Sequence, residues 1–410
     1  MSRRTVLIAG AGITGPALAY WLSLYGMTPT IVERALVLRD GGQTVDLRGA
    51  GLDVIRRMGL EAAARDVATR EAGIRFVDDR NRTKAALPAD AFGGRGPVAE
   101  LEILRPLLST LLYEHTRNDT EYLFGDEITS LKDEGPQVHA TLKNAGERSF
   151  DYVIAADGIR SRTRDLVFTN TRIKGLGLRT AYFTIPHQPA DGRWARWHNA
   201  PRHRSITLRP DNLGTTRAAL SYLTPAQDDE RLATTDQKQL LHRVFGGLAW
   251  EVPRILTEMD NASDFFFESV GQVHMPRWFT GRIAAVGDAA YCASPLSGMG
   301  TSLALTGAYI LAGELATTHH HRRLHRLREH PAPLHRTRTE ATAGNPARRP
   351  APHQGRHRTP QHRPAHGNHQ TSQHTPGTLP RPTGRHPHFA HLPLVDRKLQ
   401  PTQGPDTRHF

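Results

Sequence analysis

The first 33 residues contain the feature that most restricts the possible fold, a short apolar run that leads directly into a glycine-rich turn. Thr5–Ala9 is apolar, and the turn Gly10-Ala11-Gly12-Ile13-Thr14-Gly15 follows it. A helical pattern then covers residues 16–25, and a second apolar run over residues 30–32 ends in Glu33. Strand, glycine turn, helix, strand and acid, in that order, predict a βαβ unit with parallel strands.

The residues of this turn have separate tasks in such a unit. Gly10 allows the tight turn, Gly12 lets backbone N–H groups approach a pyrophosphate at the helix N-terminus, and Gly15 lets the helix pack closely on the strand. Glu33 is positioned to accept a hydrogen bond from a ribose hydroxyl. The alternative is a glycine turn without a ligand. The strand, helix and acid around the motif favour dinucleotide binding.

Further glycine-containing elements lie far along the chain, two of them directly after predicted strands. They are Asp157-Gly158, after a strand over residues 150–156, Gly287-Asp288, after an apolar run over residues 283–286, and Gly298-Met299-Gly300, which opens an apolar helix to about residue 315. Parallel α/β folds gather such turns at the carboxyl ends of their strands, so we expect these elements to meet one ligand.

The segments between these elements predict a second, β-rich part of the chain. Leucines at helical spacing over residues 101–113 predict a helix with Pro106 in its first turn. Residues 176–264 alternate as strands, interrupted by one polar helix over residues 229–245, and they contain no glycine motif. We therefore expect a separate antiparallel sheet there, which would form a substrate-side domain.

Net charge and cysteine usage exclude several classes of protein. The chain of 410 residues has a net charge of +13, but residues 317–410 hold 16 Lys and Arg against 4 Asp and Glu, so the first 316 residues are nearly neutral. Specific nucleic-acid binding is therefore not expected. The single Cys292 excludes an internal disulfide and is expected to be a free buried thiol. Without an apolar leader or a long apolar run, we expect a cytoplasmic protein outside the membrane.

The segment 317–410 differs in composition from the rest of the chain. It is rich in His, Arg and Pro and poor in aliphatic residues, so it cannot bury enough apolar surface to fold, and we expect a disordered basic tail. His319-His320-His321 lacks the spaced partners of a metal site, and any nucleic-acid binding would be nonspecific. Residues 320–336 can also be back-translated so that the next frame reads as a plausible helix. A frameshift is therefore a second hypothesis for this tail.

With Gly10-Ala11-Gly12-Ile13-Thr14-Gly15, Asp157-Gly158 and Gly287-Asp288 in this order, the chain resembles the FAD-dependent aromatic hydroxylases over residues 4–316. These are flavoprotein monooxygenases related to para-hydroxybenzoate hydroxylase and to the tetracycline-inactivating monooxygenases. The resemblance implies an α/β fold in which a Rossmann-like FAD-binding domain, with a parallel sheet, is discontinuous in sequence. The expected ranges are FAD-binding domain 1–175 and 265–316, an inserted antiparallel substrate sheet 176–264, and tail 317–410.

The resemblance also implies a role for individual residues of this chain, and all of these roles concern cofactor binding. Gly10, Gly12 and Gly15 would hold the FAD pyrophosphate, with Glu33 and Arg34 at the adenosine ribose. The remaining cofactor-binding residues implied by the resemblance are Asp46, Arg105, Asp157, Gly287, Asp288, Pro295, Gly298 and Gly300, with Arg39 as an NADPH candidate by position.

The implied activity needs no catalytic side chain and no metal, because the flavin carries the chemistry. FAD would be bound, NADPH and molecular oxygen would be consumed, and a flavin C4a-hydroperoxide would hydroxylate a phenolic or polyketide-like aromatic of secondary metabolism. The enzyme would be a monomer or homodimer. The rival hypothesis is an inactive FAD-binding remnant whose basic tail contacts polyanions nonspecifically.

For three groups of side chains the sequence suggests structural roles. Arg160, Arg162 and Arg164 are read as a solvated face. Phe265-Phe266-Phe267 is read as core. For Trp194 and Trp197, lining a substrate cavity and packing the sheet remain equally open.

Overall fold

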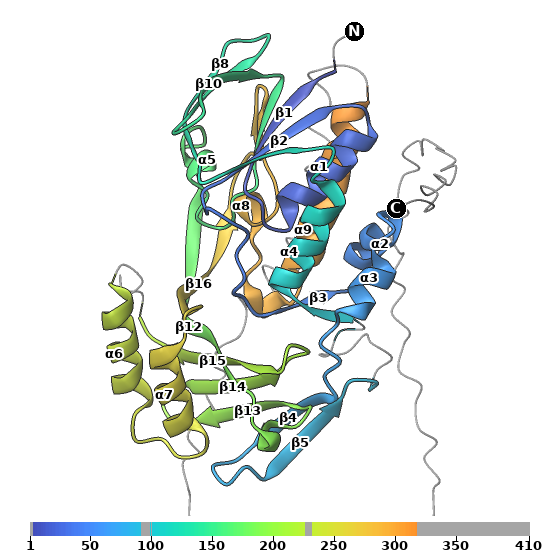
Figure 1. Ribbon diagram of the computed structural model, residues 1–410. Coiled ribbons are helices and arrows are strands. Elements are labelled where there is room, and N and C mark those ends of the chain that lie inside the picture. The colour runs from blue at the N-terminus through green and yellow to red at the C-terminus, as the bar shows by residue number, and fades with distance from the viewer. Residues whose placement is uncertain (1–2, 92–98, 100, 226–231, 318–410) are drawn as a thin grey trace, which may run out of the picture. The chain divides into compact units, whose positions relative to one another are not determined.

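The computed structural model describes residues 3–91, 99, 101–225 and 232–317 (Figure 1). The expected disordered tail, its histidine cluster and the frameshift hypothesis therefore lie outside the described residues, apart from Thr317. None of the described helices is long and apolar enough to cross a membrane.

A six-stranded sheet forms the centre of the first part of the fold. Its strand order is β17-β18-β11-β1-β2-β7, and all neighbours are parallel except β17 and β18. These strands come from widely separated segments, as expected for a discontinuous domain. Their bounds are β1 Thr5–Ala9, β2 Thr28–Glu33, β7 Glu121–Phe124, β11 Tyr152–Ala155, β17 Phe279–Thr280 and β18 Ile283–Ala285.

Both faces of this sheet are covered. On one face, Leu7 and Ala9 belong to an apolar cluster with Val138 and Phe150 of a three-stranded antiparallel sheet. Because side chains alternate along a strand, Ile8 points to the opposite face, where Gly15 at the start of the first helix packs against it. The covering elements are β8 Ile128–Asp133, β9 Val138–Leu142 and β10 Gly146–Phe150, with helices α1 Thr14–Leu24, α4 Arg105–Thr116 and α9 Gly300–Ala316 (Figure 1).

A two-stranded antiparallel ribbon and several short elements complete this part. The ribbon pairs β3 Thr44–Leu47 with β6 Leu101–Leu104. The residues 101–104 therefore form a strand, and the helix predicted over residues 101–113 begins only at Arg105, with Pro106 in its first turn. The other elements are α2 Ala50–Arg57, α3 Glu61–Asp66, α5 Arg162–Asp165, α8 Asp288–Tyr291 and the 3-10 turn η3 Pro295–Ser297.

A seven-stranded sheet forms the second part, in the order β16-β12-β15-β14-β13-β4-β5. It differs from the expected antiparallel insertion over residues 176–264 in two ways. Strands β4, β5 and β16 join it from outside that range, and β13 pairs with β4 in parallel. Which strands join a sheet is decided by pairing between distant segments, and the alternation of polar and apolar residues within one strand does not predict that pairing. The bounds are β4 Gly73–Val77, β5 Thr83–Pro88, β12 Arg172–Pro186, β13 Ala195–Ala200, β14 Arg204–Pro210, β15 Thr215–Leu223 and β16 Phe266–His274.

The two faces of this sheet differ in polarity. Phe183, Leu208 and Leu220 pack on one face against helices α6 (Thr234–Phe245) and α7 (Val252–Asn261). The polar helix expected over residues 229–245 corresponds to α6, whereas α7 was not predicted. The opposite face of the sheet carries Tyr182 and Thr184 of β12 and Arg217 of β15. One face is therefore an apolar core, and the other carries mostly polar side chains. Phe266, which the sequence analysis expected in the core, is 53% exposed on this second face, opposite Tyr182.

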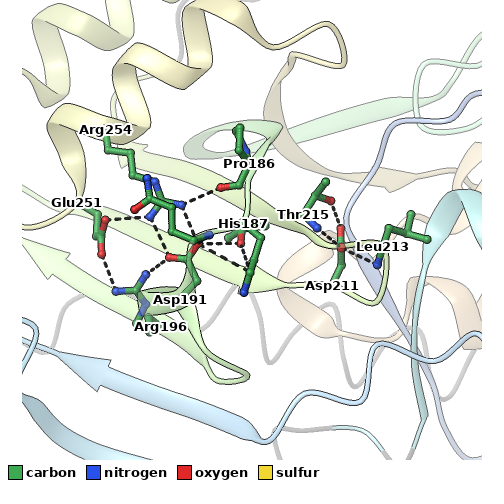
Figure 2. A network of polar contacts seen from close by, with 11 residues as sticks. Pro186, His187, Asp191, Arg196, Asp211, Leu213, Thr215, Glu251 and Arg254 are labelled. Carbon is green, nitrogen blue, oxygen red and sulfur yellow. Dashed lines mark hydrogen bonds and ion pairs between the residues drawn. The ribbon is translucent and has the colours of Figure 1, made fainter.

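A buried ion-pair network centres on Asp191, which ends the 3-10 turn η1 (Pro189–Asp191) (Figure 2). Its side chain is 0% exposed. It binds Arg196 of β13 and accepts a hydrogen bond from Arg254 Nη2 of α7 at 2.7 Å, and Glu251 pairs with both arginines. This network connects α7 and η1 to the sheet.

Candidate functional site

The glycine-rich turn is packed so closely that two of its positions require glycine. A Cβ on Gly15 would lie 2.0 Å from the carbonyl oxygen of Gly10. Gly10 has a φ of +103°, and its Cβ would lie 2.9 Å from the Cα of Asp157. The first motif and the Asp157-Gly158 motif are therefore in direct contact, as expected for turns at the ends of neighbouring parallel strands.

Helix α1 begins at this turn without a side-chain cap. Its N-cap residue is Ile13, which makes no capping hydrogen bond. The positive end of the helix dipole is therefore not offset by a capping side chain and suits an anion such as a pyrophosphate. Glu33, at the end of β2, accepts hydrogen bonds from Ala11 N and Ala35 N, each at 2.9 Å. Glu33 thus lies beside the turn, where the sequence places it.

The side chain of Arg105 extends from the start of α4 over the same turn. A Cβ on Gly12 would lie 3.4 Å from Arg105 Nη2. Within the part of the chain that the structure describes, the guanidinium makes no hydrogen bond to protein. Burial lowers the pKa of Arg105, with Arg39 adding to that effect, and Asp288, Glu33 and Glu268 oppose it. A positive group without hydrogen-bonding partners beside Gly12 suits a phosphate ligand.

The Gly287-Asp288 motif meets the turn from the other side. Gly287 has a φ of +66°, and its Cβ would lie 2.5 Å from Thr14 Oγ1 at the start of α1. Asp288 begins α8, and a Cβ on Gly300 would lie 3.9 Å from its Oδ1. Burial raises the pKa of Asp288, and Arg105 opposes that rise. Asp288 therefore lies between the first turn and the start of α9.

The start of α9 is bordered by Asp46 and by a strained turn. A Cβ on Gly298 would lie 3.3 Å from Asp46 Oδ2. Helix α9 has no side-chain cap at Met299, so its N-terminus is also available to a ligand. Ser294, next to the exposed Pro295, has a φ of +82°, and its buried Oγ has no hydrogen-bond partner among the described residues. Strain of this kind is concentrated at ligand sites.

Asp157 and Arg164 have roles that differ from the sequence-based expectation or add to it. Asp157 accepts hydrogen bonds from Ser161 Oγ and from Thr163 N, so its carboxylate holds the start of α5. The reading of Arg164 as part of a solvated face was wrong. Its guanidinium is buried and donates to the carbonyl oxygens of Ile159 at 2.9 Å and Ala289 at 3.1 Å. Arg164 thereby links the Asp157-Gly158 and Gly287-Asp288 motifs.

Glu268 is a site residue that the sequence analysis missed. It lies on β16 opposite Thr180 of β12. Burial raises its pKa to about 7, Asp288 adds to the rise, and Arg160 and Arg105 oppose it. The carboxyl group of Glu268 makes no hydrogen bond within the described ranges. Its only sequence signal is an acidic residue directly after the Phe265-Phe266-Phe267 run, and only strand pairing brings it to Asp288 and Arg105.

Other candidate residues lie farther from the group formed by Gly12, Arg105 and Asp288. Arg34 is exposed, and Arg39 Nη2 lies 3.9 Å from Glu33 Oε1. Trp194 packs under Arg75 at 4.3 Å, and Trp197 lies against Phe76 but is 38% exposed. These contacts do not decide between packing the sheet and lining a substrate cavity.

The remaining titratable groups add two observations. Cys292 is a free, buried thiol, as expected, and burial raises its pKa. Among the described residues there is no cluster of His, Cys, Asp and Glu that could hold a metal ion.

A family of FAD-binding domains matches residues 3–330 of the chain. A flavin-dependent monooxygenase of Phoma sp., eupH, is 38% identical over 77% of this chain and 78% of its own length. The chain belongs to this family of FAD-dependent monooxygenases. It is therefore a flavin-dependent oxidoreductase, and FAD is its cofactor, as the sequence predicted.

The chain is also similar to an uncharacterised protein and to a solved structure. An uncharacterised protein of Mycobacterium tuberculosis is 42% identical over 76% of this chain and 85% of its own length. The crystal structure of the tetracycline destructase Tet(55) superposes with a TM-score of 0.74, at 33% identity, over 83% of this chain and 90% of that one. The predicted fold class, with parallel and antiparallel sheets around an FAD site, is thereby confirmed.

The residues of the site fit FAD. Two helix N-termini without side-chain caps suit its anionic pyrophosphate and the electron-rich end of a flavin. At Gly12 a Cβ would meet only the end of the Arg105 side chain, at 3.4 Å from Nη2, so the turn backbone and a positive group lie close together as a phosphate ligand requires. Carboxylates at Glu33 and Asp288 are suited to accept hydrogen bonds from sugar and ribityl hydroxyl groups.

Proposed function

We propose that this chain uses NADPH and molecular oxygen to hydroxylate a small polar aromatic compound at FAD bound along the line from Glu33 to Gly298. The observation that carries the proposal is the convergence of Gly12, Arg105, Asp288 and Gly300, which come from four separate elements.

Each part of that line has a distinct task in the proposal. The N-terminus of α1 and Arg105 hold the pyrophosphate, and Asp288 accepts from the ribityl hydroxyl groups. The N-terminus of α9, with Gly298, faces the flavin and stabilises negative charge there. Bound FAD, once reduced by NADPH, supplies the activation of oxygen. The protein therefore needs to bind, orient and exclude water, and no nucleophilic side chain is required.

The polar face of the seven-stranded sheet supports a polar substrate. Tyr182 and Thr184 alternate with the apolar Phe183, so they face away from the core formed with α6 and α7. Arg217 lies opposite Thr184 on that face, and Glu268 lies opposite Thr180. Arg217 is buried and donates hydrogen bonds to Thr184 and Asp211, so the hydroxyl group of Tyr182 and the carboxyl group of Glu268 are the candidates to recognise an oxygenated ring system.

Two further points narrow the proposal. Relatives more than 30% identical include solved tetracycline destructases, which supports a phenolic or polyketide-like aromatic as the substrate class. Arg39, exposed and close to Glu33, is proposed to contact NADPH as a transient co-substrate. The rival function is an FAD-binding protein without turnover.

The test uses the purified full chain. An absorbance spectrum measures bound flavin, and NADPH oxidation is then followed with a panel of phenols and with tetracycline, with NADH as the alternative donor. The proposal predicts flavin absorbance, substrate-accelerated NADPH oxidation and a product heavier by one oxygen atom.

Two results would decide against the proposal. Flavin binding with no acceleration by any member of the panel favours the inactive remnant. NADPH oxidation that yields only hydrogen peroxide, with the aromatic compound unchanged, indicates an oxidase. Asp260→Asn, on the exposed end of α7, serves as the matched control for every site variant.

A further inference from the structure

Three carboxyl and two guanidinium groups meet where the β3–β6 ribbon approaches strand β14. Arg209 Nε donates to Glu71 Oε1 at 2.9 Å, and Arg209 Nη2 donates to Glu71 Oε2 and Glu102 Oε2, each at 2.7 Å. The side chains of Glu71 and Glu102 are only 1% and 6% exposed. One arginine of the seven-stranded sheet thus binds two buried carboxylates.

Asp46 joins this group through strand pairing. It lies directly opposite Glu102 in the antiparallel ribbon, and its Oδ2 is 2.5 Å from Arg48 Nη2. Like charges directly opposite each other destabilise a sheet, so guanidinium groups are needed on both sides of the pair. We name Asp46, Arg48, Glu71, Glu102 and Arg209 the Asp46 cluster.

The charges of the Asp46 cluster do not balance. With every group ionised, three carboxylates face two guanidinium groups, which leaves one net negative charge in a poorly solvated place. Protonation of one carboxylate removes that charge. It costs less free energy than keeping an unpaired charge buried. Burial, together with Glu102, raises the pKa of Asp46 to about 6 against the opposing effect of Arg48 and Arg209, and burial also raises the pKa of Glu71.

The cluster extends from the substrate sheet to the flavin end of the proposed site. Its Asp46 end is in contact with the turn before α9, because a Cβ on Gly298 would lie 3.3 Å from Asp46 Oδ2. The Arg209 end lies on β14 of the seven-stranded sheet. A ligand next to Gly298 would remove water from Asp46, and desolvation favours the neutral form of a carboxyl group.

We propose that the Asp46 cluster takes up one proton from solvent when FAD binds, and that Arg209 is the positioning residue that sets how firmly this proton is held. The proton adds to an oxygen of Asp46, and no other bond changes. A neutral carboxyl group beside Gly298 removes negative charge from the place where electrons enter a bound flavin. This inference rests on the proposed placement of the flavin next to Gly298.

Calorimetric titration of the flavin-free full chain with FAD tests this, in pairs of buffers with different ionisation enthalpies between pH 5.5 and 8. The difference in heat between two buffers counts the protons exchanged. Near pH 6.5 the wild-type chain is expected to take up more protons than Asp46→Asn, by a large fraction of one proton. Any exchange at Glu268, whose pKa is also raised, is common to both proteins and cancels in this difference. Asp53→Asn, at an exposed position on α2, is the matched control and is expected to behave as the wild type.

Arg209→Lys keeps the test decisive if Asp46→Asn binds FAD too weakly. It preserves the positive charge but loses the paired hydrogen bonds to Glu71, so the pH of maximal uptake is expected to rise by about half a unit or more. FAD binding without proton uptake by the wild type, or equal uptake by Asp46→Asn, would overturn the inference alone. A wild-type chain that binds no FAD would overturn the inference and the proposed function together.

Discussion

The guanidinium of Arg105 lies directly over Gly12, so that a Cβ at position 12 would be 3.4 Å from Nη2. The contact joins the start of α4 to the turn before α1, although 93 positions separate the two residues. It places a positive group beside the uncapped N-terminus of α1, where the proposed phosphate of FAD would lie.

Gly12→Ala is expected to fold and to bind FAD at least about tenfold more weakly, because the methyl group meets only the mobile end of Arg105 and occupies the phosphate space. Gly15→Ala is expected to abolish folding, since its Cβ would lie 2.0 Å from a backbone oxygen. Thermal unfolding and FAD fluorescence quenching measure the two effects. Equal FAD affinity of Gly12→Ala and the wild type would contradict the proposed phosphate position.

Asp288→Ala is expected to weaken FAD retention by roughly ten- to a hundredfold, because hydrogen bonds to hydroxyl groups of the cofactor are lost. The flavin-free protein is expected to be no less stable, since burial already disfavours the charge of Asp288. The ratio of flavin to protein absorbance after gel filtration measures occupancy, with Asp260→Asn as control. Unchanged occupancy would refute the role given to Asp288.

Asp191→Ala is expected to destabilise the protein by about 3 kcal/mol, because Arg196 and Arg254 lose the buried carboxylate between them and keep only Glu251 as a partner. Urea unfolding checks this, and Asp191→Asn should lose less. Although burial opposes it, hydrogen bonding by Arg254 and the nearby arginine charges lower the pKa of Asp191. The stability that ionised Asp191 contributes is therefore fully present above the pKa of an unfolded aspartate. It is lost as the pH falls through the lowered pKa of Asp191 in the folded protein. A loss within experimental error of zero would show that the network in Figure 2 is not stabilising.

Glu268→Gln is expected to flatten the pH dependence of stability. The pKa of Glu268 is raised to about 7 by burial and Asp288, so its favourable effect is complete below the pKa of an unfolded glutamate and is lost as the pH rises through 7. Relative to Glu268→Gln, the flavin-free wild type should lose up to about 3 kcal/mol between pH 5 and 8. Chemical unfolding at four pH values measures the difference. Parallel curves for the two proteins would contradict the raised pKa.

Much of the cofactor site could be predicted because its elements are local. Glycine positions, the strands beside them and the acids that follow are encoded within a few residues, and steric limits at Gly10 and Gly15 leave little choice of side chain. The order of the three motifs along the chain was sufficient to predict the family, the fold class and FAD. The same local signals placed α1, α4 and α9 to within a few residues of their observed starts.

The sequence by itself therefore determined the βαβ start, the cofactor and the family of this protein. Only the tertiary structure decided that β4, β5 and β16 join the substrate sheet, that Arg164 is buried between two motifs, and that Glu268 reaches Asp288. It also decided that Glu71 and Glu102 share Arg209, with Asp46 opposite Glu102. The reason is physical: pairing of distant strands brings these residues together, and the burial that follows sets their charges, whereas no local pattern in the chain records either one.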